Sequence, residues 1–180
     1  GDVGAGDAGQ KKVAAQLEEL CKTYAPHAML FLGDNFYNHG VASVDDPQWQ
    51  IKYLDMYGGD CLGQIKVYAV LGNHDYKGSV SAQILYTEKD PTGRWIMPAR
   101  YYRVTFGSLL TLLAVDTNFP DKCYLPWLCS MDWLASESAK AKTDWTLAMG
   151  HHPLISGGKY AKKRFHLEWT LADAVCAMQP

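Results

Sequence analysis

Three short apolar stretches of the chain each end at a glycine, and the glycine is followed by a polar residue. The stretches with their following residues are 28–32 with Gly33-Asp34, 67–71 with Gly72-Asn73, and 145–149 with Gly150-His151. Short apolar runs bounded by turn residues are typical of buried strands. The chain also begins with Gly1-Asp2, so a glycine followed by a polar residue occurs there as well.

The strands that this pattern predicts would bring several metal-ligand side chains together. If the strands are parallel and adjacent, their carboxyl ends lie side by side, where open α/β sheets bind ligands. Asp2, Asp34, Asn73 and His151 would then converge on one place. Such a mixed oxygen and nitrogen donor set suits hard or borderline metal ions. The pattern therefore indicates a metal-dependent enzyme.

Helical periodicity fills most of the chain between these stretches. Asp7 with Gln10 forms a capping box, which predicts a helix that ends before Pro26. Its apolar face is expected to contain Val13, Leu17, Leu20, Cys21 and Tyr24.

Further elements follow from the same patterns. Helices are predicted at 48–57, 80–87, about 130–141 and 166–178, and residues 101–106 and 109–115 read as a β-hairpin. The order of strands and helices predicts an α/β fold with a hairpin, in a single domain over residues 1–180.

The composition is that of an ordinary globular domain. With 180 residues, 48% hydrophobic and 20% charged, the chain can bury a sizeable core. A net charge of -2 gives no sign of a nucleic-acid partner. No apolar run approaches the roughly 20 residues that span a bilayer, and no signal peptide is visible. Membrane association is therefore not evident, and the oligomeric state is left open.

The five cysteines do not show zinc-finger spacing. Cys21 is expected to be a core thiol, because it lies on the apolar face of the first helix. Cys123 and Cys129 flank a loop that a disulfide could close. The alternative is that all five cysteines are free thiols in a reducing compartment, and the sequence leaves both possibilities open.

Two loops carry the residues with the most specific chemistry. Asp34 offers two oxygens that can bridge two metals, and Tyr37 offers a phenolate that favours Fe(III). In the second loop, Asn73 offers a neutral amide oxygen for a divalent ion, and His74 can donate a proton or bind an anionic oxygen. Asp75 could accept a hydrogen bond from the His74 ring. The alternative without a metal is that Asp34 is a capping residue and Tyr37 a packed side chain. Asn73 and His74 would then form an ordinary turn after the second strand.

The third loop contains two adjacent histidines. His151 stands in the ligand position after glycine, whereas His152 is expected to point the other way and to line the site. A lone histidine after a strand is more often structural, and Asp2 is a weak signal by itself. The ligand interpretation depends on all of these sites occurring together.

These motifs, taken in order, resemble those of the purple acid phosphatases, which are calcineurin-like metallophosphoesterases. The motifs are Gly1–Gly4, Gly33–Tyr37, Gly72–Asp75 and Gly150–Pro153. The small tartrate-resistant acid phosphatases are the most similar branch. Three further stretches support the resemblance, which extends to about Ser156: Asn38–Val41, Gly78–Ile84 and Arg94–Pro98.

The resemblance implies a β-sandwich flanked by helices, in α-β-β-α layers, with a dinuclear site of Fe(III) and a divalent Fe, Zn or Mn ion. By this resemblance, Asp2 and Tyr37 bind the ferric ion, Asp34 bridges both ions, and Asn73 and His151 bind the divalent ion. Tyrosinate-to-iron charge transfer would colour the protein purple.

The implied activity is that of an acid phosphatase acting on phosphate monoesters. A metal-bound hydroxide attacks phosphorus in line, while His74 contacts the phosphate and helps to protonate the leaving group. No nucleic-acid binding is expected. The resemblance places the protein in the secretory pathway, in a lysosome-like compartment or outside the cell.

The chain departs from the family pattern in two places. The family's final Gly-His-x-His motif does not occur, and it is expected beyond residue 180; a strand before Gly1 is also expected. A substrate-facing histidine that usually follows the third loop is replaced within 157–164, where Tyr160 or Lys159 stands in its place.

Two rival functions remain. An apicomplexan phosphatase-like scaffold, which anchors a parasite motor complex to a membrane, is similar around Arg94–Pro98 and Ser156–Tyr160. The retained ligand-type residues favour catalysis over that role. A dinuclear phosphoesterase for diesters or nucleotides is the second rival, and Tyr37 argues against it.

Overall fold

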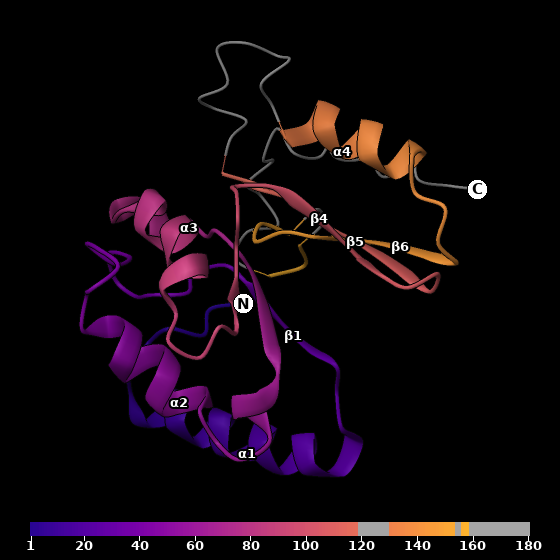
Figure 1. Cartoon of the computed structure of the whole chain (residues 1–180). Helices are drawn as coiled ribbons and strands as arrows, with labels where there is room; N and C mark the ends of the chain where they lie inside the picture. The colour runs from indigo at the N-terminus through magenta and orange to yellow at the C-terminus, as the bar shows by residue number, and fades with distance from the viewer. Residues whose placement is uncertain (119–129, 154–155, 159–180) are drawn as a thin grey trace. The chain divides into compact units, whose positions relative to one another are not determined.

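The computed structural model describes residues 1–118, 130–153 and 156–158, and for 130–132 it describes the backbone alone. The chain forms two compact units, Gly1–Ala99 and Arg100–Pro180, and each is considered separately (Figure 1). The predicted helix at 166–178, like Cys123, Cys129 and Tyr160, lies outside the described residues.

The first unit is built on a parallel three-stranded sheet. Its strands are β1 (Ala28–Leu32), β2 (Lys66–Val70) and β3 (Trp95–Ile96), in the order β1-β2-β3. The prediction that the first two apolar stretches form adjacent parallel strands is confirmed. Strand β3 was not predicted, because two residues are too few to show a periodic pattern.

Helix α1 (Ala8–Tyr24) begins as predicted, with the Asp7 side chain accepting from the backbone N–H of Gln10. The predicted apolar face is wrong at Val13, Leu20 and Tyr24, which are exposed, and right at Cys21, which is buried together with Gln10 and Ala14. The side-chain carboxamide of Gln10 explains why a different side of α1 faces inward. It accepts from Gly6 N at 2.6 Å and donates to Lys52 O at 2.7 Å, so a polar contact fixes which side of the helix faces inward.

The remaining helices of this unit confirm the periodicity. A π-helical turn at Gln50–Leu54 continues into α2 (Asp55–Tyr57), and α3 (Val80–Lys89) is capped by Ser79. Short 3₁₀ turns occur at Leu62–Gln64 and Asp75–Lys77.

Aromatic side chains dominate the core between the helices and the sheet. Trp49 and Tyr86 stack at 3.5 Å, and Trp95 is fully buried against them. Edge-to-face contacts join the rest of the group: Phe31, Phe36, Tyr53 and Tyr57.

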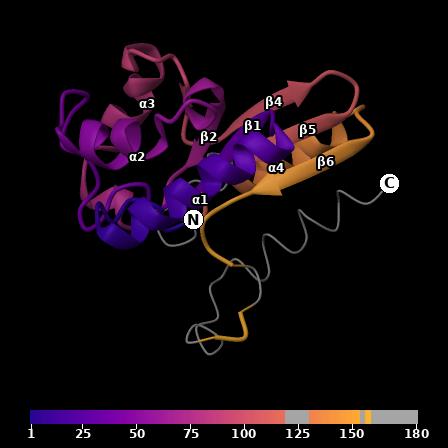
Figure 2. The same cartoon turned by 90° about the horizontal axis from the view of Figure 1, so that it is seen from below.

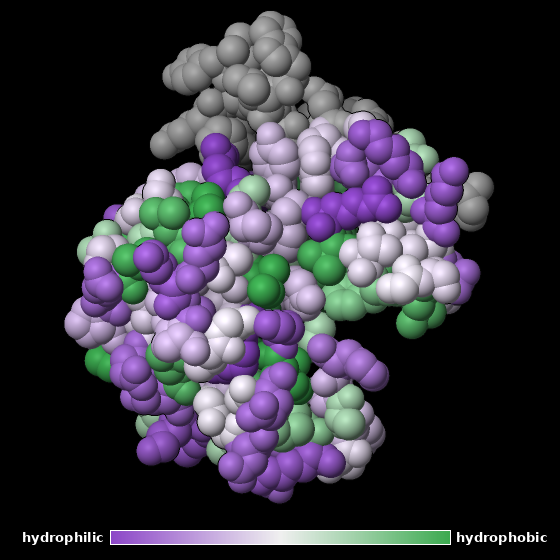
Figure 3. All heavy atoms as spheres, in the orientation of Figure 1, coloured by the Kyte–Doolittle hydropathy of each residue, from purple (hydrophilic) through white to green (hydrophobic). Residues whose placement is uncertain are grey.

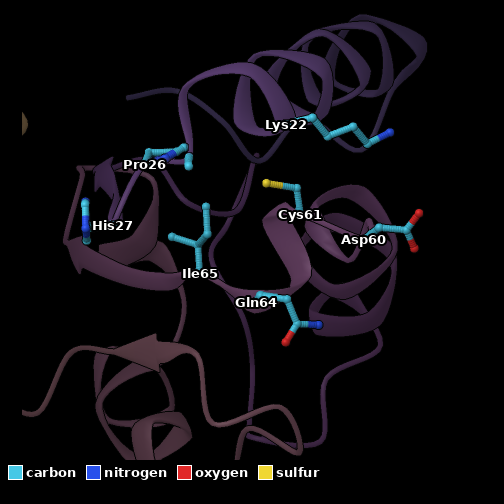
Figure 4. Close-up of a pocket in the computed structure, with 8 residues that line it drawn as sticks. Lys22, Pro26, His27, Asp60, Cys61, Gln64 and Ile65 are labelled. Carbon is cyan, nitrogen blue, oxygen red and sulfur yellow. The ribbon is translucent and has the colours of Figure 1, made fainter.

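Cys21 is buried as expected, but it is not a free thiol. It forms a disulfide with Cys61, which links the end of α1 to the segment before β2. This pairing was not predicted, because a sequence separation of 40 carries no local signal. A shallow pocket opens beside the disulfide, and its lining comes from Lys22, Ala25, Pro26, His27, Asp60, Cys61, Gln64 and Ile65 (Figure 4).

The second unit contains the predicted hairpin and a further strand. Strands β4 (Tyr102–Phe106) and β5 (Leu110–Ala114) are antiparallel, and β6 (Trp145–Met149) pairs parallel to β5. Helix α4 (Ser130–Ala139) lies along this sheet, with Leu134 packed against Leu113 and Val115 (Figures 1 and 2).

The place of β6 corrects one expectation. Its sheet, β4-β5-β6, is separate from the sheet of β1 and β2, so the strand before His151 is not adjacent to the strands before Asp34 and Asn73. Short apolar runs show that strands exist but not which strands pair, so the sequence could not decide whether all three strands are adjacent and parallel.

The fold class is the predicted one, a mixed α/β structure with helices and two small sheets. Hydrophilic residues are spread over the face shown in Figure 3, with small hydrophobic groups between them. Within the described part of the chain, no helix is both long and apolar enough to cross a membrane.

Candidate metal centre

The candidate centre lies where β1 and β2 end. The parallel register pairs Leu32 with Val70, so the loops that carry Asp34 and Asn73 leave the sheet at the same level. A side chain at Gly72 could not be accommodated, since its Cβ would lie 2.1 Å from Asp34 N. Gly72 therefore allows the two loops to approach each other closely.

The first residues of the chain pack onto the loop after β1. Asp2 N donates to Gly33 O at 2.9 Å, and Tyr37 N donates to Gly4 O at 2.9 Å. A Cβ on Gly4 would lie 1.8 Å from Asn35 O, so this approach also requires glycine. Asp2 thus reaches the same strand end as Asp34.

The hydroxyl of Tyr37 marks the point where ligand-type side chains meet. It donates a hydrogen bond to the Asp2 carboxylate. Burial, followed by hydrogen bonds to Asp2 and Asp34, raises the pKa of Tyr37 well above its ordinary value. Asp34 is buried, Tyr37 is partly exposed and Asp2 is exposed, so this group of oxygens is open to solvent on one side.

The chemistry of this donor set fits a hard cation. Two carboxylates and a phenol oxygen gather negative charge at one point, which disfavours ionisation of the tyrosine unless a positive ion is present. Anionic oxygen ligands of this kind suit trivalent iron better than soft metals. Among the residues that the structure describes, no three His, Cys, Asp or Glu side chains form a cluster that could hold a metal ion, so the gathered set depends on the tyrosine.

His74 is fixed beside this group by two contacts. Its backbone N–H donates to Asp34 Oδ1 at 2.9 Å, and its ring nitrogen Nδ1 lies 2.7 Å from Asn38 O. Since a carbonyl oxygen can only accept, Nδ1 carries the proton, and Nε2 is the nitrogen left for proton exchange with a substrate. The Tyr37 ring lies 4.5 Å away, centroid to centroid.

Asp75 has partners other than the predicted ring of His74. Its buried carboxylate accepts from Gly72 N at 2.8 Å, from Gln83 Nε2 at 2.9 Å, and from Asn35 N and Phe36 N. Burial raises the pKa of this carboxyl, and the donated hydrogen bonds partly offset the effect. Asp75 therefore joins the loop after β1 to the loop after β2.

Two amide side chains that the sequence analysis did not single out complete this connection. Asn35 Nδ2 donates to Val70 O at 2.9 Å and to Gln83 Oε1 at 3.1 Å. Gln83 is fully buried on α3. Gln83 could have been identified from its place on the inner face of a predicted helix, because buried amides require hydrogen-bond partners.

In the second unit, the two histidines follow β6. His152 N donates to Thr117 Oγ1 at 3.0 Å, and its ring nitrogen Nδ1 lies 2.8 Å from the same hydroxyl. Thr117 follows β5 and is buried, as is Asp116, which pairs with Arg100 at 2.9 Å. These two residues were also missed, because β5 ends without a glycine. The prediction that His151 joins the ligands of the first unit stays a prediction.

The sheets, the glycine-bounded loops and the gathered donors define a class of protein. The chain belongs to the calcineurin-like phosphoesterase family, whose family model matches residues 1–177. The resemblance inferred from the four motifs is thereby confirmed.

Particular relatives are acid phosphatases. The chain is 32% identical over 162 residues to tartrate-resistant acid phosphatase type 5 of Oryctolagus cuniculus, a match that covers 79% of this chain and 49% of the relative. It is 30% identical to purple acid phosphatase 3 of Arabidopsis thaliana, over 86% of this chain and 46% of the relative. The chain thus spans about half the length of the curated relatives that it matches.

A solved structure shows the same fold. It is described as GAP50, the anchor in the inner membrane complex of Plasmodium, and it aligns with a TM-score of 0.81 at 26% identity. The alignment covers 98% of this chain and 60% of that one. The predicted metallophosphoesterase fold is confirmed.

Proposed function

We propose that the protein is a dinuclear-metal acid phosphatase that hydrolyses phosphate monoesters. The observation that carries the proposal is the meeting of the Tyr37 hydroxyl with the carboxylates of Asp2 and Asp34. A tyrosine beside two carboxylates at a strand end is a donor set that suits a ferric ion. The acid phosphatases among the relatives support the same activity.

In this proposal each ligand-type residue has a distinct role. Asp2 and Tyr37 would hold Fe(III), Asp34 would contact both ions, and Asn73 with His151 would hold a divalent Fe, Zn or Mn ion. When bound, such a pair of ions polarises the phosphate and lowers the pKa of water at the site.

His74 supplies the acid that the leaving group needs. With Nδ1–H donated to Asn38 O, the ring presents Nε2, and its protonated form donates that proton to the leaving oxygen. The contact between His74 N and Asp34 Oδ1 fixes the distance from this acid to the metal ligands. Water attacks phosphorus directly, and no phospho-enzyme is formed.

The disulfide supports an oxidising location. Disulfides persist in secreted, lysosomal or extracellular settings and are rare in the cytosol. The Cys21–Cys61 bond is therefore consistent with a protein of the secretory pathway, a lysosome-like compartment or the cell exterior.

The second candidate function is a non-catalytic scaffold, and the likeness to the Plasmodium anchor favours it. The two functions differ in whether metal and turnover are present. A scaffold has no need to keep the Tyr37–Asp2 contact or the ring of His74 in place.

The proposal is tested by metal analysis and a visible spectrum of the full-length protein. We expect iron together with a divalent metal, and an absorption band that Tyr37→Phe removes while a matched Tyr24→Phe, on the exposed side of α1, retains it. A protein without iron and without such a band would not be a purple acid phosphatase.

A further inference from the structure

Lys52 lies in the π-helical turn Gln50–Leu54, and its side chain reaches the loop that carries Tyr37. Its Nζ atom donates hydrogen bonds to the backbone carbonyl oxygen of Tyr37 and, at 2.7 Å, to Gln48 Oε1. The lysine is only partly exposed, so water is partly excluded from these contacts. Lys52 has no part in the function proposed above, yet its ammonium group is bonded to the main chain of a proposed iron ligand.

Lys52 also contacts the first residues of the chain. A Cβ on Gly6 would lie 2.9 Å from Lys52 Cε, so the aliphatic part of the lysine lies directly against this glycine. The backbone oxygen of Lys52 accepts from Gln10 Nε2 at 2.7 Å, and Gln10 Oε1 accepts from Gly6 N at 2.6 Å. Lys52 therefore joins the two segments that carry Asp2 and Tyr37.

The turn that carries Lys52 is itself fixed in the aromatic core. The next residue, Tyr53, is 1% exposed, and its ring makes edge-to-face contacts with Phe31 and Trp49. Charged donors form shorter and stronger hydrogen bonds than neutral ones. An ammonium group on a rigid element therefore limits where the carbonyl group that accepts from it can lie.

We propose that Lys52 is a positioning residue, which holds the main chain of Tyr37 so that the phenol hydroxyl meets the Asp2 carboxylate. The inference rests on the proposed function, in which Tyr37 and Asp2 would hold Fe(III). Lys52 would then control iron binding without being a ligand. Residues that orient a metal ligand in this way typically change metal affinity by about tenfold to a hundredfold.

The test uses Lys52→Met in the full-length protein, because methionine keeps an apolar side chain against Gly6 and removes the ammonium group. The variant should bind iron about tenfold more weakly, and its tyrosinate-to-iron absorption band should shift or lose intensity. Lys52→Arg retains a charged donor and should restore most of both properties. Lys66→Met is the matched control and should change neither, since Lys66 Nζ also donates to a backbone carbonyl, that of Gly93, but at the start of β2 and not at its end. An iron affinity and a band unchanged in Lys52→Met would overturn the inference.

A measurement on the metal-free protein separates this inference from the proposed function. With 3-fluorotyrosine incorporated, the ¹⁹F resonance of Tyr37 is the one that Tyr37→Phe removes. Lys52→Met should shift or broaden this resonance, and Lys66→Met should leave it unchanged. Lower stability in urea with an unchanged Tyr37 resonance would show that Lys52 only stabilises the fold, and would overturn the inference. If Lys52→Met does not fold, Lys52→Gln, which is uncharged and one atom shorter, gives the same comparison. Absence of iron from the unmodified protein would count against the proposed function, and the ¹⁹F spectra would still decide the role of Lys52.

Discussion

The absence of a Cβ atom at particular glycines allows the loops at the end of β1 to lie close together. The Cα atoms of Gly4 and Gly72 lie so close to the neighbouring loop that a Cβ at either position would collide with its backbone. The sequence pattern of glycine followed by a ligand-type residue was therefore informative for a physical reason. The loops of Asp2, Asp34 and Asn73 lie at one strand end, and the Tyr37 hydroxyl contacts Asp2 there, while their roles as metal ligands stay a prediction.

Asn73 gives a prediction about metal selectivity. It is proposed to contact only the divalent ion, and its amide is a neutral donor, so Asn73→Ala should lose most of the divalent metal while most of the iron remains. The ratio of the two metals, measured by elemental analysis, checks this. Equal loss of both metals would contradict the assignment of Asn73 to one ion.

Asp90 gives a prediction about acid stability. Burial alone would raise the pKa of this carboxyl, but hydrogen bonds from Thr92, Trp95 and Tyr53 outweigh it and lower the pKa below the ordinary value. A lowered pKa contributes stability above the unfolded value of about 3.9, and this contribution is lost as the pH falls through the folded value.

Asp90→Asn should therefore destabilise the protein by about 2 kcal/mol at pH 7, and the difference from the unmodified protein should shrink at a pH of about 2. Urea unfolding at both pH values measures it. The exposed Asp45, replaced by Asn, is the control and should change stability at neither pH. A difference that stays constant with pH would show that Asp90 acts through packing alone.

Secondary-structure elements were largely predictable, whereas their pairing and orientation were not. Strands β1, β2 and β6, the hairpin and four helices follow from periodicity, because each repeats its pattern over several residues. On α1 the burial of Cys21 was predicted correctly, but Val13, Leu20 and Tyr24 were wrongly placed inside, because the polar contacts of Gln10 fix which side of the helix faces inward. Strand pairing depends on contacts between distant segments, so the sequence left open which strand lies next to β6.

The disulfide between α1 and the segment before β2 gives a prediction at this scale. Closing a loop between residues 40 apart lowers the entropy of the unfolded chain. Replacing both Cys21 and Cys61 by Ser should reduce the free energy of unfolding by about 4 kcal/mol. Urea unfolding with and without dithiothreitol measures this. The reductant should destabilise the unmodified protein and leave the double variant unaffected; an unmodified protein insensitive to reductant would argue against the bond.

At the scale of the whole molecule, the chain belongs to the calcineurin-like phosphoesterase family and has its fold. Its acid phosphatase activity is our proposal. The ligands assigned to Fe(III), with Asp34 and Asn73, come from the first unit, and His151 comes from the second. The chain spans about half of its curated relatives, so the measurement that matters most is made on the full-length protein.

The most direct test is the rate of p-nitrophenyl phosphate hydrolysis by the full-length, iron-containing protein as a function of pH. The proposed function predicts saturable turnover with a maximum at acidic pH, as for an acid phosphatase, and a loss of about a hundredfold or more in His74→Ala, which removes the proposed proton donor. Bound iron without turnover at any pH would contradict the proposal and would favour a scaffold.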